Sequence, residues 1–465
     1  MSLLHPHSAT TKAITVNPNR NLLVAIAAAI IGIIYGYDLG NISGALLFIP
    51  TEFHLNSTFL VESITTVVVL GSIAGALLGG PLANAIGRKA TMVIVATAYA
   101  IFALLSAFAT GLIWLDITRF LLGITIGLSV IAAPIFVAES VAASVRGRLV
   151  VMYQLATVFG ILIAYFIDFG LAAGGHWRIM LGLAALPSLI VLFLLLPLPD
   201  TPRWYVMKGR RQKALDTLSR IEPVETAKRE VDELEDDLKR EQGGRLVDMF
   251  KPPFSKATLF VLVLGFLIQI TGINAVVFYS PLIFQAMGFK GNFSLLILPG
   301  FVQIASLIAT IIALSIVDRL GRRPTLLTGI LVMILSDILL AVIFGFGRFT
   351  GALSILGFVG ILFFTAAFNF GFGSMVWVYS SESFPAQLRT LGASMMLTAD
   401  LVANAIIAFF FLSALTSLGG VVTFLILLAF AVIAWFFVFW LAPETKGRPL
   451  EAIRGYWENG GKWSD

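Results

Sequence analysis

The strongest constraint on the fold is a series of twelve apolar runs, each about as long as a membrane-crossing helix. A bilayer core about 30 Å thick needs roughly 20 apolar residues per helix. Hydrophobic residues make up 58% of the chain and charged residues only 12%, against about 25% charged residues in soluble domains. Most of this apolar surface must therefore face lipid, and we predict an all-α membrane protein. The twelve segments are 22–48, 61–83, 90–110, 113–137, 149–172, 178–197, 257–285, 295–317, 325–346, 353–380, 391–416 and 420–442.

The apolar runs divide into two groups of six around a hydrophilic stretch. Residues 198–256 carry 13 basic and 12 acidic residues, and Val231, Leu234 and Leu238 recur there at helical spacing. This stretch is expected to be a cytoplasmic helical linker, either a solvated spacer or a part of a gate. The predicted parts are an N-terminal tail (1–21), a six-helix half (22–197), the linker (198–256), a second six-helix half (257–442) and a C-terminal tail (443–465).

The distribution of cations predicts the orientation. If both tails and the linker are cytoplasmic, 27 of the 31 Lys and Arg residues lie inside. With the long linker left out, 14 cations lie inside and four elsewhere, and an excess of Lys and Arg marks the cytoplasmic side. We therefore expect a multi-pass protein of the cell inner (plasma) membrane with both termini in the cytoplasm. The net charge of +5 then reflects topology, and no nucleic-acid partner is expected.

Three short motifs recur at matching span ends in the two halves. Their offsets are 234, 243 and 244 residues, and their order is the same. Repeated halves of six spans are typical of transporters whose substrate site lies between the halves near the middle of the membrane. The paired positions are Arg88 and Arg322, Glu139 and Glu382, Arg146 and Arg389, and Asp200 and Glu444.

This ordered set of motifs resembles the sugar porter family of the major facilitator superfamily, which includes proton-coupled bacterial sugar symporters and animal glucose facilitators. The resemblance covers the chain beyond its N-terminal tail. It implies a secondary active transporter that imports a monosaccharide (hexose or pentose) or a related polyol by proton symport through alternating access. The implied partners are the sugar or polyol, protons and the lipid bilayer, with a proton gradient in place of a cofactor and the protein acting as a monomer.

Three other functions remain open: a passive sugar facilitator, a proton symporter of another small solute such as an organic acid, and a non-transporting sugar sensor. An enzyme is not expected, because no nucleophile–base pair and no phosphate-binding glycine loop is visible in the sequence. The chain also has no cysteine, which excludes thiol catalysis and thiolate metal sites. No metal site is expected.

The repeated motifs place cations and carboxylates near one membrane surface. Contacts among them can form when that side is closed and break when it opens, which gives the two states that alternating access requires. The alternative is that single cations only anchor the topology. The predicted cytoplasmic gate consists of Arg88, Glu139 and Arg146 in the first half and Arg322, Glu382 and Arg389 in the second.

Two opposite charges lie inside apolar spans. Asp38 is in the first span and Arg119 in the fourth. An ionised group at mid-bilayer costs roughly 2.5–3.5 kcal/mol on insertion scales, so each is a functional candidate. Opposite charges in a shared interior lower the cost of burying each other. The resemblance implies that Asp38 is the proton site, since passive facilitators carry Asn there, and that Arg119 tunes it.

Isolated polar side chains in apolar spans are candidates for binding sugar hydroxyls. Gln269 and Asn274 are five residues apart, about 140° around a helix, so they share a cavity only if it is wide or the helix is broken near Gly272. Asp400 is either a substrate contact or a second proton site. The resemblance maps Gln154, Gln269, Asn274, Trp377 and Asn404 onto sugar-contacting positions and Tyr279 onto a position beside the outer gate.

Overall fold

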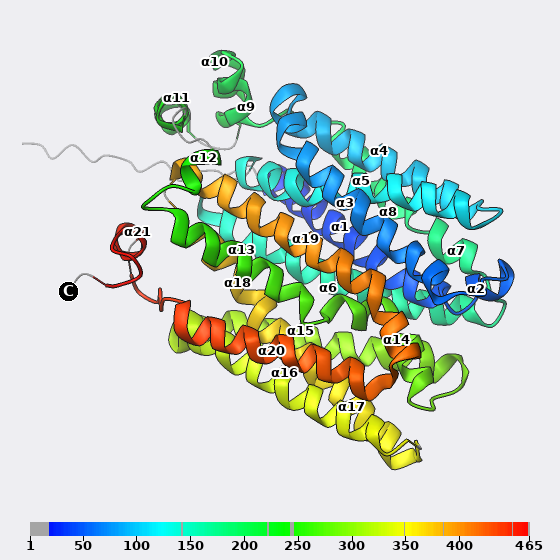
Figure 1. Cartoon of the computed structure of the whole chain (residues 1–465). Helices are drawn as coiled ribbons and strands as arrows, with labels where there is room; N and C mark the ends of the chain where they lie inside the picture. Colours follow the sequence, from blue (N-terminus) through cyan, green and yellow to red (C-terminus); the bar gives the residue numbers. More distant parts are fainter. Residues whose placement is uncertain are drawn as a thin grey trace, which may run out of the picture.

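The computed structural model describes residues 18–140, 143–220, 223–241, 246–347, 349–384, 386–448 and 450–463. Within these ranges every regular element is a helix (Figure 1). Eleven helical segments in this part of the chain are long and apolar enough to cross a membrane. With α1 they give twelve spans in two six-helix halves, which confirms the predicted fold class.

The first half contains six spans, the last of which is interrupted. A short helix, α2, follows the first span. The elements are α1 (Pro18–Ala45), α2 (Ile49–Glu52), α3 (Thr58–Ile86), α4 (Arg88–Ala107), α5 (Leu112–Ser140), α6 (Ala143–Ala172), α7 (Trp177–Gly182) and α8 (Ala185–Leu195).

The second half also contains six spans, three of which are interrupted or locally widened into π-helical turns. These turns, η1 and η2, belong to the eighth and tenth spans. The elements are α13 (Ser255–Ile270), α14 (Ile273–Ala286), η1 (Phe293–Ile297), α15 (Leu298–Leu320), α16 (Arg322–Gly345), α17 (Gly351–Phe368), η2 (Asn369–Gly373), α18 (Ser374–Glu382), α19 (Ala386–Ser417) and α20 (Gly419–Leu441).

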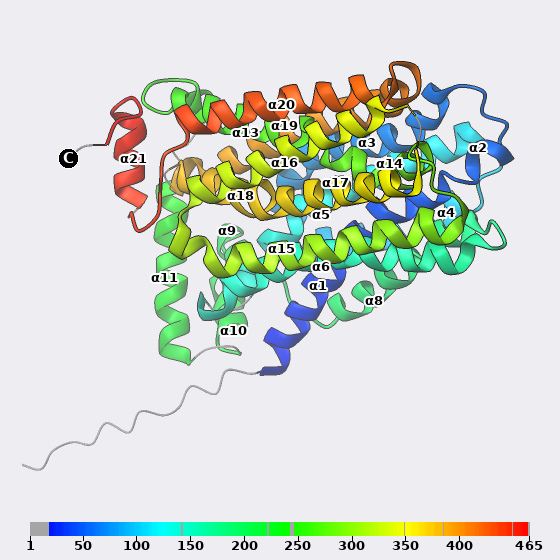
Figure 2. The same cartoon turned by 90° about the horizontal axis from the view of Figure 1, so that it is seen from below.

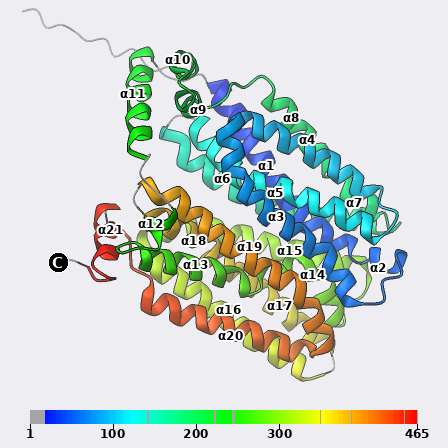
Figure 3. The same cartoon turned by 45° about the horizontal axis from the view of Figure 1, so that its top comes forward.

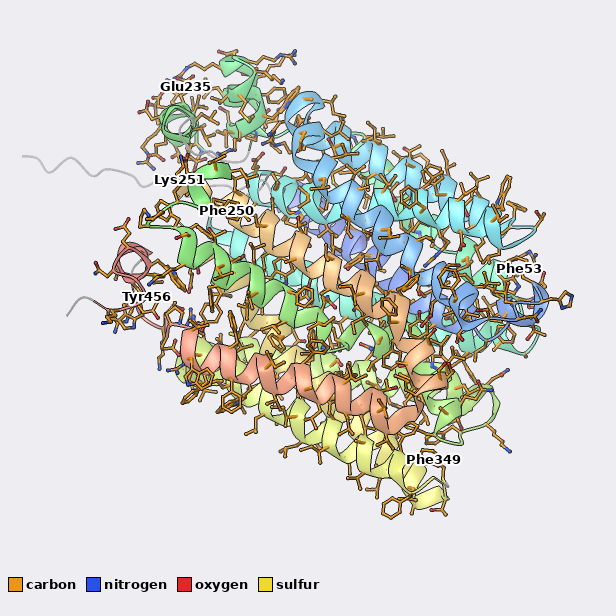
Figure 4. The ribbon with its side chains drawn as sticks, viewed as in Figure 1. Phe53, Glu235, Phe250, Lys251, Phe349 and Tyr456 are labelled. Carbon is orange, nitrogen blue, oxygen red and sulfur yellow. The ribbon has the colours of Figure 1, made fainter. Side chains whose placement is uncertain are left out.

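Five further helices lie together at one end of the bundle (Figures 1 and 2). We call this the linker end, and the opposite end, where α2 lies, the far end. Side chains labelled in Figure 4 mark the two ends: Glu235 and Tyr456 at the linker end, and Phe53 and Phe349 at the far end. The five helices are α9 (Pro202–Met207), α10 (Arg211–Leu218), α11 (Val224–Glu241), α12 (Leu246–Met249) and α21 (Leu450–Glu458).

Glycines allow very close packing between α3 and α5. A Cβ atom at Gly123 would lie 2.1 Å from the backbone oxygen of Val68, and one at Gly127 would lie 2.1 Å from that of Ser72. Small residues at such positions let helix backbones approach, which is how helices associate in lipid. The helix that carries Arg119 is thereby fixed against α3.

Candidate functional site

A buried ion pair joins α1 to α5. Arg119 Nη1 lies 3.0 Å from Asp38 Oδ1, and both side chains are 2% exposed. Tyr99, on α4, lies close to Asp38, and its hydroxyl donates to the backbone oxygen of Ile34 (3.5 Å). Arg119 Nε has no hydrogen-bond partner among the described residues. The structure therefore brings the two predicted charges together. Tyr99 was not predicted from the sequence, because a tyrosine in an apolar run carries no charge signal.

The seventh span is broken at Gly272, which is one of the two conditions under which Gln269 and Asn274 were expected to share a cavity. Gly272, with φ of 98°, separates α13 from α14. That conformation is readily adopted only by glycine. Gln269 lies near the end of α13, and Asn274 lies in the first turn of α14. The two amides therefore lie on separate helices on either side of the break, and their sharing one site stays a prediction.

A polar cluster lies between α13 and α19. The side chain of Asp400 lies close to that of Gln269, and Asn404 follows one turn later on α19. Both residues are buried: Asp400 is 6% exposed and Asn404 is 3% exposed. Oε1 of Gln269 and Oδ1 of Asn404 have no partner in the described part of the chain. Because buried polar atoms are normally hydrogen-bonded, these two acceptors are candidate ligand contacts.

Two other predicted contacts lie on different helices. Gln154 is half-buried on α6, and Trp377 is 38% exposed on α18. Just before α18, the π-helical turn η2 contains Asn369, a buried amide whose Nδ2 donates to the backbone oxygen of Thr365 (3.0 Å). The sequence analysis overlooked Asn369, although it gives the same signal as Gln154, an isolated amide in an apolar span. π-Helical turns inside α-helices are frequent at functional sites.

The described hydrogen bonds between the halves lie toward the far end. The Tyr279 hydroxyl, which is fully buried, lies 2.6 Å from Thr65 Oγ1 and donates to the backbone oxygen of Ala408 (2.6 Å). The Tyr165 hydroxyl donates to the backbone oxygen of Val277 (2.8 Å). α3 and α19 run side by side at this contact (Figure 3). The residue predicted to lie beside the outer gate thus lies at the junction of the halves.

At the linker end of the first half, the carboxylate of Glu139 interacts with several donor groups. Its Oε2 accepts from Arg88 Nε (3.0 Å) and from Thr201 Oγ1 (2.6 Å), and its Oε1 is 3.7 Å from Arg203 Nε. Asp200 accepts from the backbone N–H groups of Arg88 (2.9 Å) and the following residue (3.3 Å). The carboxylate of Asp200 therefore caps the start of α4.

The second half repeats the cap, and among its described residues the guanidinium of the corresponding arginine bonds a different carboxylate. Glu444 accepts from the backbone N–H groups of Arg322 and Arg323, both at 3.1 Å. The guanidinium of Arg322 bonds Asp318 (3.0 Å), while Oε2 of Glu382 is without a partner in the described part. Each of these contacts stays within its own half. The remaining two predicted gate residues, Arg146 and Arg389, have side chains outside the described residues.

Comparisons with known proteins agree with this geometry. The family model described as sugar (and other) transporter matches residues 24–457. The arabinose-proton symporter of Escherichia coli (strain K12) is 34% identical over 437 residues, which cover 93% of this chain and 92% of that protein. The proton:xylose symporter XylE, of the major facilitator superfamily and bound to 6-bromo-6-deoxy-D-glucose, has a TM-score of 0.79 at 27% identity, covering 95% of this chain and 100% of that chain.

The inward open conformation of XylE from E. coli has a TM-score of 0.81 at 26% identity, covering 94% of this chain and 100% of that chain. The resemblance found in the motifs is thereby confirmed over nearly the whole chain. The chain belongs to the sugar (and other) transporter family, as a multi-pass membrane protein of the major facilitator superfamily.

Proposed function

We propose that this chain is a secondary active transporter that imports a monosaccharide (hexose or pentose) or a related polyol by proton symport through alternating access. The observation that carries the proposal is the ion pair of Asp38 with Arg119, whose side chains are both 2% exposed. A proton-coupled carrier needs one such buried group that can be charged or neutral. The arabinose-proton symporter, 34% identical to the chain, supports coupling to protons. The driving force is the proton gradient, and no cofactor takes part.

The proton step follows from the geometry of the pair. A proton taken up by Asp38 neutralises the carboxyl group and removes its attraction for Arg119, 3.0 Å away. An unpaired charge in a buried site is costly, so Arg119 must then find another partner or move. Asp38 is on α1 and Arg119 is on α5. Protonation of Asp38 therefore changes the relative energies of different arrangements of α1 against α5.

The substrate step uses the polar cluster between α13 and α19. Sugar hydroxyls can donate to Oε1 of Gln269, to Oδ1 of Asn404 and to the carboxylate of Asp400, with Asn274 adding an amide across the break at Gly272. Gln154 and Trp377 complete the site from α6 and α18, where the indole offers a face for the C–H side of the ring. An organic acid fits less well, because Asp400 would repel it when ionised.

The arrangement of contacts supports an inward-facing state. The described hydrogen bonds between the halves lie toward the far end around Tyr279, and the solved inward open XylE has a TM-score of 0.81. The excess of cations at the linker end supports a cytoplasmic location for that end and for both termini, in the inner (plasma) membrane. The proposed gate residues, Arg88, Glu139, Arg146, Arg322, Glu382 and Arg389, then control cytoplasmic access in a monomeric transporter.

The test is transport by the purified protein in proteoliposomes. Radiolabelled hexoses, pentoses and polyols are supplied outside, with an imposed proton gradient, and a protonophore is added in a parallel sample. We expect at least one of these solutes to accumulate above its external concentration and the protonophore to abolish the accumulation. Uptake that only equilibrates and ignores the protonophore would make the protein a facilitator. Uptake of an organic acid alone would identify another substrate class.

A further inference from the structure

Glu62 makes a further contact between the halves, separate from those of Tyr279 and Tyr165. This side chain on α3 is 1% exposed. Its Oε1 accepts from the backbone N–H of Ser413 and its Oε2 from the Ser413 hydroxyl, both at 2.6 Å. Ser413 lies in the last turns of α19, in the other half. Both oxygens of the carboxylate are therefore engaged by one residue across the junction.

The position of Glu62 links this contact to the one around Tyr279. Thr65, which lies 2.6 Å from the Tyr279 hydroxyl, is three residues later on α3 and so on the same side of the helix. Two neighbouring side chains of α3 thus hold the second half through different helices: Glu62 holds α19, and Thr65 contacts α14. Hydrogen bonds to an ionised group are about twice as strong as neutral ones, so the contact of Glu62 with α19 is the stronger candidate for a latch.

Other carboxylates at the far end bond within the first half. Glu52 accepts from Trp177 Nε1 and Arg178 Nη1, both at 2.5 Å. The bond from Trp177, followed by that from Arg178, holds the pKa of Glu52 below its ordinary value. Asp116 accepts from Ser63 (2.9 Å), on the neighbouring helix of the same half. Among these far-end carboxylates, Glu62 is the one with described bonds across the junction.

We propose that Glu62 is a positioning residue for transport, an outer latch whose carboxylate holds α19 against α3 while the linker end is open. The far end cannot open to admit substrate until Glu62 releases Ser413, because the contact joins the two halves that must separate there. The latch thereby sets the balance between the two states without touching substrate. This inference rests on alternating access in the proposed function, and it does not depend on which solute or ion is carried.

The test measures the separation of the halves directly. The chain has no cysteine, so spin labels can be attached to introduced cysteines without removing others. Ser57 and Ser417 are exposed residues at the far end of the first and second half respectively. In the double variant Ser57→Cys/Ser417→Cys, we expect double electron–electron resonance to give one dominant short distance between the two spin labels. Adding Glu62→Gln should raise the ratio of long to short distances about tenfold, since hydrogen bonds to a charged acceptor are lost.

Two further variants make the result specific. Glu52→Gln removes a far-end charge whose bonds stay in the first half, and should leave the distances unchanged. Ser413→Ala keeps the backbone donor and removes the hydroxyl, so it should shift the ratio in the same direction by less. Adding Ser413→Ala to Glu62→Gln should have little further effect. An unchanged distribution in folded Glu62→Gln, or equal shifts in Glu62→Gln and Glu52→Gln, would overturn the latch.

The measurement also separates this inference from the proposed function. It is made without sugar and without a proton gradient, so it reports only the conformational balance. A protein that transported no sugar could still show the latch. If the protein proved to be a sugar–proton symporter but Glu62→Gln left the far-end distances unchanged, the latch would be wrong and the proposed function would stand.

Discussion

Gln269 and Asn404 each leave one buried oxygen without a hydrogen-bond partner among the residues that the structure describes. A buried acceptor that receives a hydrogen bond from a substrate hydroxyl contributes more to binding than an exposed acceptor does. The reason is that a buried acceptor without a hydrogen bond costs free energy. We therefore expect Gln269→Ala to weaken sugar binding by about 1–3 kcal/mol. Isothermal titration with the transported sugar measures this change. Gln285→Ala, an exposed position on α14, is the matched control, and equal affinities in both variants would place the substrate elsewhere.

The role of Asp400 gives a second prediction for a single residue. Because its side chain lies close to that of Gln269, we expect it to act in substrate recognition. Asp400→Asn should change the order of preference among hexoses, pentoses and polyols in uptake assays, and should leave the proton dependence intact. A change in the pH profile of uptake with the same order of preference would instead identify Asp400 as a second proton site.

At the scale of elements, the sequence predicted the twelve spans and raised a break near Gly272 as one alternative, but it did not predict the other interruptions. Apolar runs report burial in lipid, whereas the break at Gly272 depends on one backbone angle that composition does not encode. The repeated motifs likewise marked Asp200 and Glu444 as important. Their contacts with backbone N–H groups at the starts of α4 and α16 could not be predicted, because such contacts depend on where the next helix begins.

The break at Gly272 gives a prediction for one element. Gly272→Ala forces a side chain into a left-handed conformation, which costs about 1–2 kcal/mol, and its Cβ would lie 2.8 Å from Leu427 Cδ1. We expect a lower melting temperature and weaker sugar binding, since Gln269 and Asn274 lose their alignment. Gly291→Ala is the control, because its φ of 80° is also positive but no atom lies within 4 Å of the added Cβ. It should lose stability but bind sugar normally; if Gly272→Ala also bound normally, the break would not organise the site.

At the scale of the whole molecule, the internal duplication predicted two halves, and the structure shows where they meet. The charge pair of Asp38 with Arg119 was predictable because charges in apolar spans are rare. Glu62 was missed although it is a charge at the start of the predicted span 61–83, because no cation in another span pointed to a partner for it. Tyr99 was missed because it carries no charge. The conformational state was not predictable either, because one sequence must support both the inward-facing and the outward-facing arrangement.

Energy coupling is a property of the whole molecule, and Asp38→Asn tests it. Asn is nearly isosteric with Asp and forms hydrogen bonds, but it cannot carry the proton or the charge that pairs with Arg119. The variant should therefore fold, bind sugar and exchange labelled for unlabelled sugar in proteoliposomes. One charge moving across 100 mV supplies about 2.3 kcal/mol, or roughly 50-fold accumulation at 1.4 kcal/mol per decade. We expect the wild type to approach that ratio under an imposed membrane potential and the variant to stay near one. Accumulation by the variant that a protonophore still abolished would mean that another group carries the proton.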